Sequence, residues 1–206
     1  YGGPIYYWLR GSTTNPSTAL GTRADLLSNY AGAQDVPTRT SQILLSQNDR
    51  HLLAFGCQPY ASGANDFDPL LIRWASQSAP EWWEPGSTVT VPSTGQLSSA
   101  GFLRVSRGSK IVRAIATRQE ILVFTDTHLY SLQYIGAIEN IFELNEYADN
   151  ISIISPRVVI SINNVTYWMG TDKFYMYDGR VQTLPCTIRE YIFKDLNYAQ
   201  ADQIIC

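Results

Sequence analysis

Two segments of the sequence share one pattern, in which an apolar strand leads through a Thr-Asp turn into an aromatic strand. In the first segment residues 121–124 are apolar, Thr125 and Asp126 form the turn, and residues 129–132 form the second strand. The second segment repeats this order with residues 167–169, Thr171 with Asp172, and residues 174–177. A repeat of this size is typical of propeller blades and other arrays. The pattern therefore limits the chain to folds in which similar β-hairpins follow one another.

The same hairpin also occurs earlier in the chain, which makes three copies. The paired strands are expected at 43–45 and 52–56, at 111–115 and 121–124, and at 158–162 and 165–169. A third strand follows each hairpin, at 70–74, 129–133 and 174–177, and candidate fourth strands lie at 88–91, 140–144 and 180–184. Three to four short strands per copy indicate the blades of a β-propeller. A sandwich of plain hairpins is the alternative, because it also contains many short strands.

The sequence thus predicts an all-β fold, with repeated antiparallel hairpins that form the blades of a β-propeller or of an incomplete part of one. We expect about three blades, at 41–108, 109–154 and 155–206, after an irregular segment at 1–40. That segment holds a possible edge strand near its start, an exposed loop at 11–18 and a possible short helix at 23–30. The spacing of Ile188, Tyr191 and Ile192 predicts one short helix near the C-terminus, before a strand resumes at Gln203.

Composition favours strands and argues against several functions. The 206 residues are 45% apolar and include 13 Tyr, 7 Phe and 5 Trp, which suit half-buried pleated surfaces. A net charge of -3 argues against a protein that grips the nucleic-acid backbone, although a channel through which DNA slides is not excluded. No apolar run reaches the roughly 18 residues that span a membrane. Cys57, Cys186 and Cys206 form no zinc-binding pattern and are expected to be free thiols.

The two aspartates of the repeat could be structural or catalytic. An Asp beside a turn accepts hydrogen bonds from nearby backbone amides and so fixes the hairpin. A catalytic carboxylate needs a partner acid or base, and neither copy supplies an obvious one. We therefore expect Asp126 and Asp172 to be structural turn residues. His51 and His128 lie in no catalytic or metal-binding motif, so the sequence predicts no catalytic, cofactor-binding or metal-binding residue.

Two other regions are candidates for contact with a partner. Trp74, Trp82 and Trp83 form the densest aromatic patch, which would be a packing unit if buried and an interface or a sugar-binding surface if exposed. An insertion at 57–68 interrupts the first copy, and its composition is that of a surface loop. Within it, Asn65, Asp66 and Phe67 are possible interface residues. A further acidic group, Glu139, Glu143 and Glu146, has no identifiable partner acid for glycoside hydrolysis.

Four segments of the sequence resemble a known group of proteins. They are residues 68–76 (DPLLIRWAS), 123–130 (VFTDTHLY), 167–175 (YWMGTDKFY) and 178–186 (DGRVQTLPC). Together they are similar to structural tail proteins of tailed bacteriophages, of the nozzle or hub type found mainly in short-tailed phages. The similarity runs from about residue 41 to the C-terminus. Proteins of this group are several times longer, so the resemblance implies that the chain is a fragment.

The resemblance implies a propeller-bearing, non-enzymatic virion protein without cofactors. It implies a homo-oligomeric ring, commonly a hexamer, at the distal end of the tail, assembled in the host bacterial cytoplasm. Its partners would be other copies of itself, other tail proteins such as adaptor or fibre subunits, and DNA as a passing polymer during genome retention or ejection. The alternative is a carbohydrate-binding or glycan-degrading propeller domain for host-surface adhesion, which requires exposed Trp82 and Trp83 beside a cluster of acids.

Overall fold

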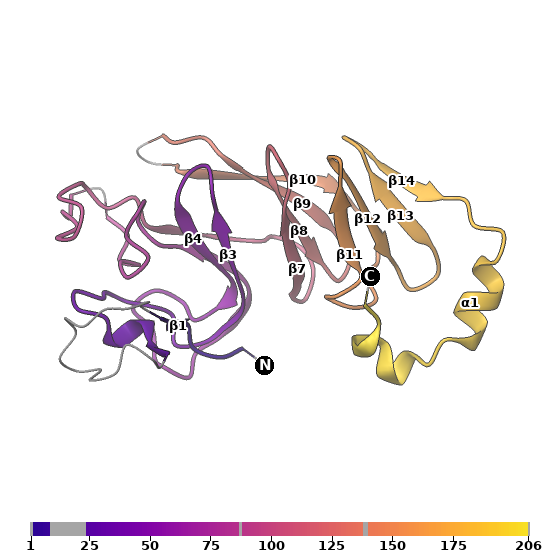
Figure 1. Cartoon of the computed structure of the whole chain (residues 1–206), viewed down its shortest axis with the longest axis horizontal. Helices are drawn as coiled ribbons and strands as arrows, with labels where there is room; N and C mark the ends of the chain where they lie inside the picture. The colour runs from indigo at the N-terminus through magenta and orange to yellow at the C-terminus, as the bar shows by residue number, and fades with distance from the viewer. Residues whose placement is uncertain (1, 9–23, 87, 138–139, 206) are drawn as a thin grey trace. The chain divides into compact units, whose positions relative to one another are not determined.

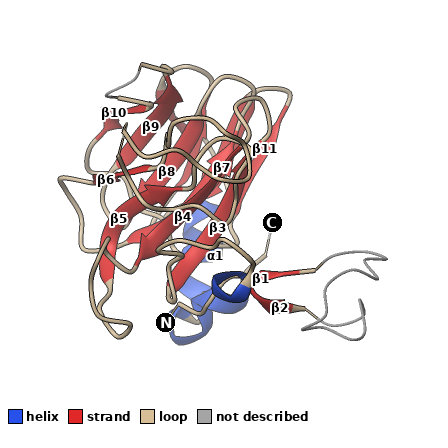
Figure 2. Cartoon of the chain, turned by 90° about the vertical axis from the view of Figure 1, so that its left-hand side faces the viewer, coloured by secondary structure: helices blue, strands red, loops and turns tan. Residues whose placement is uncertain are grey.

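Three four-stranded antiparallel sheets follow one another along the chain (Figures 1 and 2). The computed structural model describes residues 2–8, 24–86, 88–137 and 140–205. In every sheet each strand pairs with its neighbours in the sequence. The predicted all-β class with repeated antiparallel hairpins is confirmed, but the described residues form no closed propeller. The chain divides into two compact units, Tyr1–Arg104 and Val105–Cys206.

The first unit contains a two-stranded and a four-stranded sheet. Strands β1 (Tyr6–Tyr7) and β2 (Asp25–Leu26) form the small sheet, and η1 (Leu27–Asn29) follows as a 3-10 turn in place of the short helix expected at 23–30. The larger sheet consists of β3 (Thr40–Ser46), β4 (His51–Cys57), β5 (Asp68–Trp74) and β6 (Gly101–Arg104). The loop expected at 11–18 lies outside the described residues.

One face of the β3–β6 sheet is covered by the segment that precedes β3 and by the connection that follows β5. Ala54, Cys57 and Leu71 of the sheet form a core with side chains of the N-terminal segment and of the connection after β5. The covering residues of this core are Ile5, Leu27, Val36, Ala75 and Trp83. The irregular N-terminal segment is therefore integral to the unit, because its apolar side chains shield the sheet from water.

The fourth strand of this sheet differs from the prediction. Residues 88–91 form no strand of the sheet; Thr90 makes an isolated bridge to Leu97, and Val91 is buried against Ala79 and Trp82. Strand β6 at Gly101–Arg104 takes the place beside β5 instead. A Cβ on Gly101 would lie 2.6 Å from the ring of Trp74, so the glycine allows β6 to pass under the indole.

The second unit contains the other two sheets and the helix. Strands β7 (Ile111–Ala116), β8 (Ile121–Thr125), β9 (Leu129–Tyr134) and β10 (Phe142–Ala148) form one sheet. Strands β11 (Val159–Ile162), β12 (Val165–Met169), β13 (Phe174–Tyr177) and β14 (Val181–Leu184) form the other. The turn between β11 and β12 is Asn163-Asn164 with φ of 51° and 68°, the left-handed backbone that tight hairpins require.

A shared core holds these two sheets together. Leu122, Phe124 and Leu129 of one sheet pack with Trp168 and Tyr175 of the other, and the rings of Phe124 and Trp168 meet edge to face at 5.1 Å. The predicted short helix is present as α1 (Arg189–Asp195), and Phe193 packs on Phe174 at 5.3 Å. After α1 the chain forms η2 (Tyr198–Gln203) and not the strand expected at Gln203.

Candidate functional site

The tryptophan patch is part of the core of the first unit. Trp83 is fully buried, Trp74 is 4% exposed and Trp82 is 6% exposed. Trp74 donates from Nε1 to the Ser99 carbonyl at 2.8 Å, and Trp83 donates from Nε1 to the Pro80 carbonyl at 2.7 Å. The exposed tryptophan pair that a sugar-binding surface here requires is therefore absent, because Trp82 and Trp83 cover the sheet and its connection.

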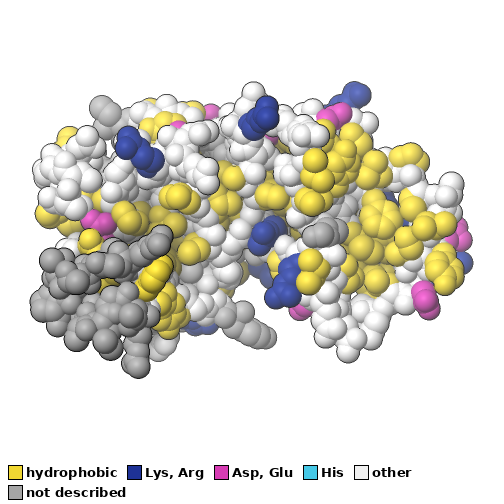
Figure 3. Space-filling view, in the orientation of Figure 1, with side chains coloured by type: hydrophobic (Ala, Val, Ile, Leu, Met, Phe, Trp, Pro, Cys, Tyr) yellow, Lys and Arg dark blue, Asp and Glu magenta, His cyan; other side chains and the backbone are white. Residues whose placement is uncertain are grey.

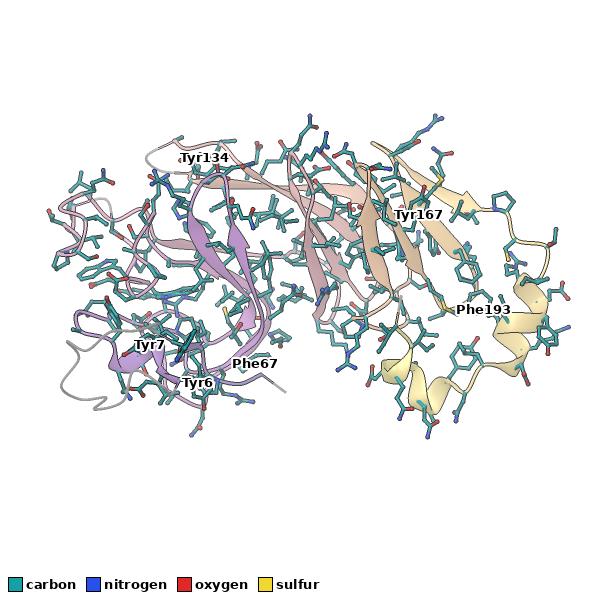
Figure 4. The ribbon with its side chains drawn as sticks, viewed as in Figure 1. Tyr6, Tyr7, Phe67, Tyr134, Tyr167 and Phe193 are labelled. Atoms are coloured by element: carbon teal, nitrogen blue, oxygen red, sulfur yellow. The ribbon has the colours of Figure 1, made fainter. Side chains whose placement is uncertain are left out.

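The insertion between β4 and β5 folds onto the first unit through a buried glutamine. Gln58 accepts hydrogen bonds from the backbone N and the hydroxyl of Thr38, each at 2.8 Å, and donates to the carbonyls of Ser62 and Gly63. The side chains of Asn65 and Asp66 are exposed, and Phe67 is half-buried beneath the guanidinium of Arg39 at 5.2 Å (Figure 4). These three candidate interface residues thus lie on an ordered surface loop.

A buried arginine connects this loop with the rest of the first unit. Arg73 is 1% exposed and donates to the carbonyls of Gln58, Asp35 and Trp83 at 3.0 to 3.1 Å. It also forms an ion pair with the Asp35 carboxylate at 2.5 Å. A buried charge is tolerated only when it is paired and hydrogen-bonded, and Arg73 meets both conditions. Its role is therefore structural.

The two Thr-Asp turns are not equivalent in the structure. The backbone bond from Thr125 to His128 at 2.9 Å corresponds to that from Gly170 to Lys173 at 2.9 Å. Asp126 therefore corresponds to Thr171, and the repeat seen in the sequence is displaced by one residue. The contacts of the two residues differ in direction: the Asp126 side chain accepts from Ser109, whereas the backbone N and the hydroxyl of Thr171 donate to Ser152 Oγ at 3.0 and 3.1 Å.

Asp126 fixes the start of strand β7 to the end of β8. It accepts from the backbone N of Ser109 at 2.8 Å and from its hydroxyl at 2.7 Å. Burial raises the pKa of Asp126, but the hydrogen bonds from Ser109 outweigh this effect and hold the pKa below its ordinary value. The side chain of Asp172 is exposed and accepts no hydrogen bond from the described residues. The turn is instead fixed by Thr171, which donates from its backbone N and its hydroxyl to Ser152 Oγ.

The two histidines have neighbouring hydrogen-bond partners, and the acidic group at residues 139–146 is described only in part. His51 is buried with Nδ1 at 2.8 Å from the Ala75 carbonyl, and burial lowers its pKa. His128 pairs with the neighbouring Thr127 hydroxyl. Glu143 is exposed, Glu146 lies 3.7 Å from Arg107, and Glu139 lies outside the described residues. Across residues 2–8, 24–86, 88–137 and 140–205 no group of three His, Cys, Asp or Glu side chains could hold a metal ion.

An apolar surface that the sequence reasoning missed lies on the β11–β14 sheet. We define the outer face as the side of this sheet opposite Trp168 and Tyr175. One row of paired residues runs across it from Ile160 through Tyr167 and Met176 to Gln182. Flanking rows add Ile162 with Val165 and Phe174 with Leu184. Figure 3 shows hydrophobic side chains gathered over these strands and α1, and Figure 4 labels Tyr167 and Phe193.

The outer face is only partly covered. Phe174 is shielded by Phe193 of α1. Ile160 remains 38% exposed and Ile162 remains 51% exposed. Apolar residues at alternating positions along 160–162 and 165–169 could have indicated a sheet that is apolar on both faces, since successive side chains of a strand point to opposite faces. Large exposed apolar patches on proteins commonly mark interaction sites.

A polar network forms a second candidate site at one end of the same unit. The Glu120 carboxylate accepts from Tyr177 OH at 2.9 Å, from Ser131 Oγ, and from Gln133 Nε2 at 3.3 Å. Gln133 Nε2 also donates to Tyr147 OH at 3.0 Å. Burial, followed by the hydrogen bond to Glu120, raises the pKa of Tyr177, which therefore remains a donor at neutral pH. No local pattern in the sequence joins these residues.

No family model matches the chain, and no curated protein matches it. No helix among the described residues is long and apolar enough to cross a membrane.

Proposed function

We propose that the chain is a structural, non-catalytic subunit that associates with other copies of itself. Following the resemblance of its repeat segments, we propose that the assembly is the ring of a nozzle or hub in a bacteriophage tail. The single observation that carries self-association is the outer face of the β11–β14 sheet. The identification of the ring as part of a virion depends on the resemblance.

The outer face corresponds to a surface that is covered elsewhere in the same unit. When the two turns are aligned, with Thr125 on Gly170, Leu122 corresponds to Tyr167 and Leu129 corresponds to Phe174. Leu122 and Leu129 lie in the core between the two sheets. The side of one sheet that carries them is thus covered by the next sheet, whereas the matching side of the next sheet is only partly covered and leaves Ile160 and Ile162 exposed. A further sheet is the partner that fits this surface.

We assign that sheet to a second copy of the chain, because the first unit carries exposed apolar side chains on the two edge strands of its larger sheet. Ile43 on β3 is 45% exposed and Leu45 is 54% exposed. Phe102 on the opposite edge strand, β6, is 51% exposed, whereas Ala54 and Arg73, which lie between it and Ile43 in the same cross-strand row, are buried. Contact between two different surfaces of identical chains is heterologous, and such contacts generate rings when the rotation closes.

The composition suits a ring around a passing polyanion. The net charge is -3, so a lumen formed by such subunits need not trap DNA through a basic surface. DNA would therefore pass through the ring, while adaptor or fibre subunits of the tail would bind the two ends of the ring.

Self-association is tested by sedimentation equilibrium over a concentration series. Wild-type chain is compared with a double variant, Ile160→Lys with Ile162→Lys. Covering these half-exposed side chains contributes on the order of 1 kcal/mol each, so the double variant should associate at least about tenfold more weakly. Lysine on an edge strand also opposes pairing with another sheet.

The matched control is Ile135→Lys, because Ile135 is 48% exposed and lies outside the outer face. It should associate like the wild type. A wild-type chain that remains monomeric at all concentrations, or a double variant that associates as tightly as the control, would refute the proposed interface.

A further inference from the structure

A pocket lies at one end of the second unit, where three hairpin turns meet. Its cavity measures about 280 Å³. The turns between β7 and β8, between β11 and β12, and between β13 and β14 contribute Glu120, Asn164 and Asp178. Gln133 of β9 and Tyr147 of β10 complete its polar and aromatic lining. The assembly proposed above uses none of these residues.

The interior of the pocket is rigidly held. Glu120 is fixed by donors from both sheets, since Ser131 and Gln133 belong to one sheet and Tyr177 to the other. The ring of Tyr147 stacks on that of Tyr177 with centroids 5.7 Å apart and an interplanar angle of 27°. Tyr147 is nevertheless 39% exposed, so part of its ring remains open to a ligand. Preorganised polar groups of this kind give a site specificity at low entropic cost.

The chemistry of the lining restricts the class of ligand. Two carboxylates, Glu120 and Asp178, line the pocket, and none of the described residues that line it is Lys or Arg. An anionic ligand would be repelled and would find no counter-charge. The amides of Gln119, Gln133 and Asn164 offer both donors and acceptors, and the carboxylates accept from hydroxyl groups. A cavity of about 280 Å³ is near the lower limit for small-molecule sites and suits one six-membered ring.

We propose that this pocket binds a single neutral saccharide unit. The C–H face of the sugar ring would pack on the exposed part of Tyr147. Its hydroxyls would donate to Asp178 and to the remaining lone pair of Glu120, and would accept from the side-chain amide of Asn164. The site is separate from the tryptophan patch.

The test is saturation-transfer NMR on the full chain with methyl glycosides of glucose, galactose and N-acetylglucosamine. Glucuronate serves as the anionic probe. We expect at least one neutral glycoside to bind with a dissociation constant on the order of 1 mM, as for a ligand of this size, and glucuronate to bind at least about tenfold more weakly. Absence of binding by all neutral glycosides, or equal binding of glucuronate, would overturn the proposal.

Two variants and one control test whether the glycoside binds in this pocket. Tyr147→Ala should weaken it at least about fivefold through loss of the stacking surface. The matched control Tyr191→Ala removes a tyrosine that is 74% exposed on α1 and should leave binding unchanged. Asn164→Gly removes the side chain with its amide, and glycine accepts the φ of 68° without strain, so this variant keeps the test valid if Tyr147→Ala unfolds. Undiminished affinity in a folded Tyr147→Ala or in Asn164→Gly would place the sugar elsewhere and refute the site.

Discussion

Replacement of Arg73 by methionine should destabilise the first unit strongly. Methionine fills a similar length of the core, so the variant removes mainly the polar contacts of the guanidinium. Those contacts are three hydrogen bonds to carbonyls and the ion pair with Asp35. Each buried acceptor that loses its donor costs roughly 1–3 kcal/mol, and loss of the ion pair with the partly exposed Asp35 adds about 1 kcal/mol. We expect a loss of about 3–5 kcal/mol, a large part of the total stability of a typical domain.

The matched variant Asp35→Asn separates the contribution of the Asp35 charge from that of the hydrogen bonds that Arg73 donates. It retains an acceptor oxygen for Arg73, and asparagine tolerates the φ of 47° at this position. The Asp35 side chain is 29% exposed, so solvent screens its charge and the expected loss is only about 1 kcal/mol. Urea denaturation monitored by tryptophan fluorescence measures both variants. The reasoning fails if Arg73→Met costs less than about 1 kcal/mol, or if Asp35→Asn costs as much as Arg73→Met.

Three further predictions concern single residues. Burial lowers the pKa of His51 in the folded chain, so the unfolded chain binds more protons below pH 6.5. The free energy of unfolding should therefore fall below pH 6.5, by at most about 1.4 kcal/mol per pH unit. His51→Gln should remove this contribution of His51 to the pH dependence, as measured by urea denaturation at several pH values. Burial also raises the pKa of Cys57 to about 12, so mass spectrometry should find maleimide on the half-buried Cys186 of the native chain but on Cys57 only after unfolding. Gly101→Ala should cost about 1–3 kcal/mol in thermal unfolding, since its Cβ would meet the ring of Trp74; an unchanged stability would contradict the close approach.

The hairpins were predictable because their signals are local. Apolar strands flanked by polar turns, such as Asn163-Asn164 between β11 and β12, specify where the chain reverses. The short helix followed from the spacing of apolar residues around Tyr191. The strand expected at Gln203 did not form, because Asn197 accepts from the backbone N of Ala199 and starts a 3-10 turn.

The errors arose where tertiary contacts override local preference. Residues 88–91 favour a strand by composition, but the place beside β5 goes to the segment whose Gly101 fits under Trp74. The Thr-Asp repeat is displaced by one residue because β12 ends at Met169 and Gly170 takes the position of Thr125. The sequence therefore predicted the correct hairpin but assigned to Asp172 the turn position that Thr171 occupies.

The candidate sites were less predictable than the fold. Burial of Trp82 and Trp83 depends on the N-terminal segment, whose path no local pattern specifies. The Glu120 network joins Ser131 with Tyr177, which lie on different sheets. A single arginine within the apolar strand β5 was the one local signal for the structural role of Arg73, since a charge in such a strand must be paired.

The most direct test of the central claim is the symmetry and copy number of the chain in its native assembly, determined by cryo-electron microscopy. The account predicts a closed ring, in the proposed case a hexamer, in which a sheet of the neighbouring copy covers Ile160 and Ile162. An assembly that contains the chain as a lone monomer, or one in which the outer face remains exposed to solvent, would contradict it.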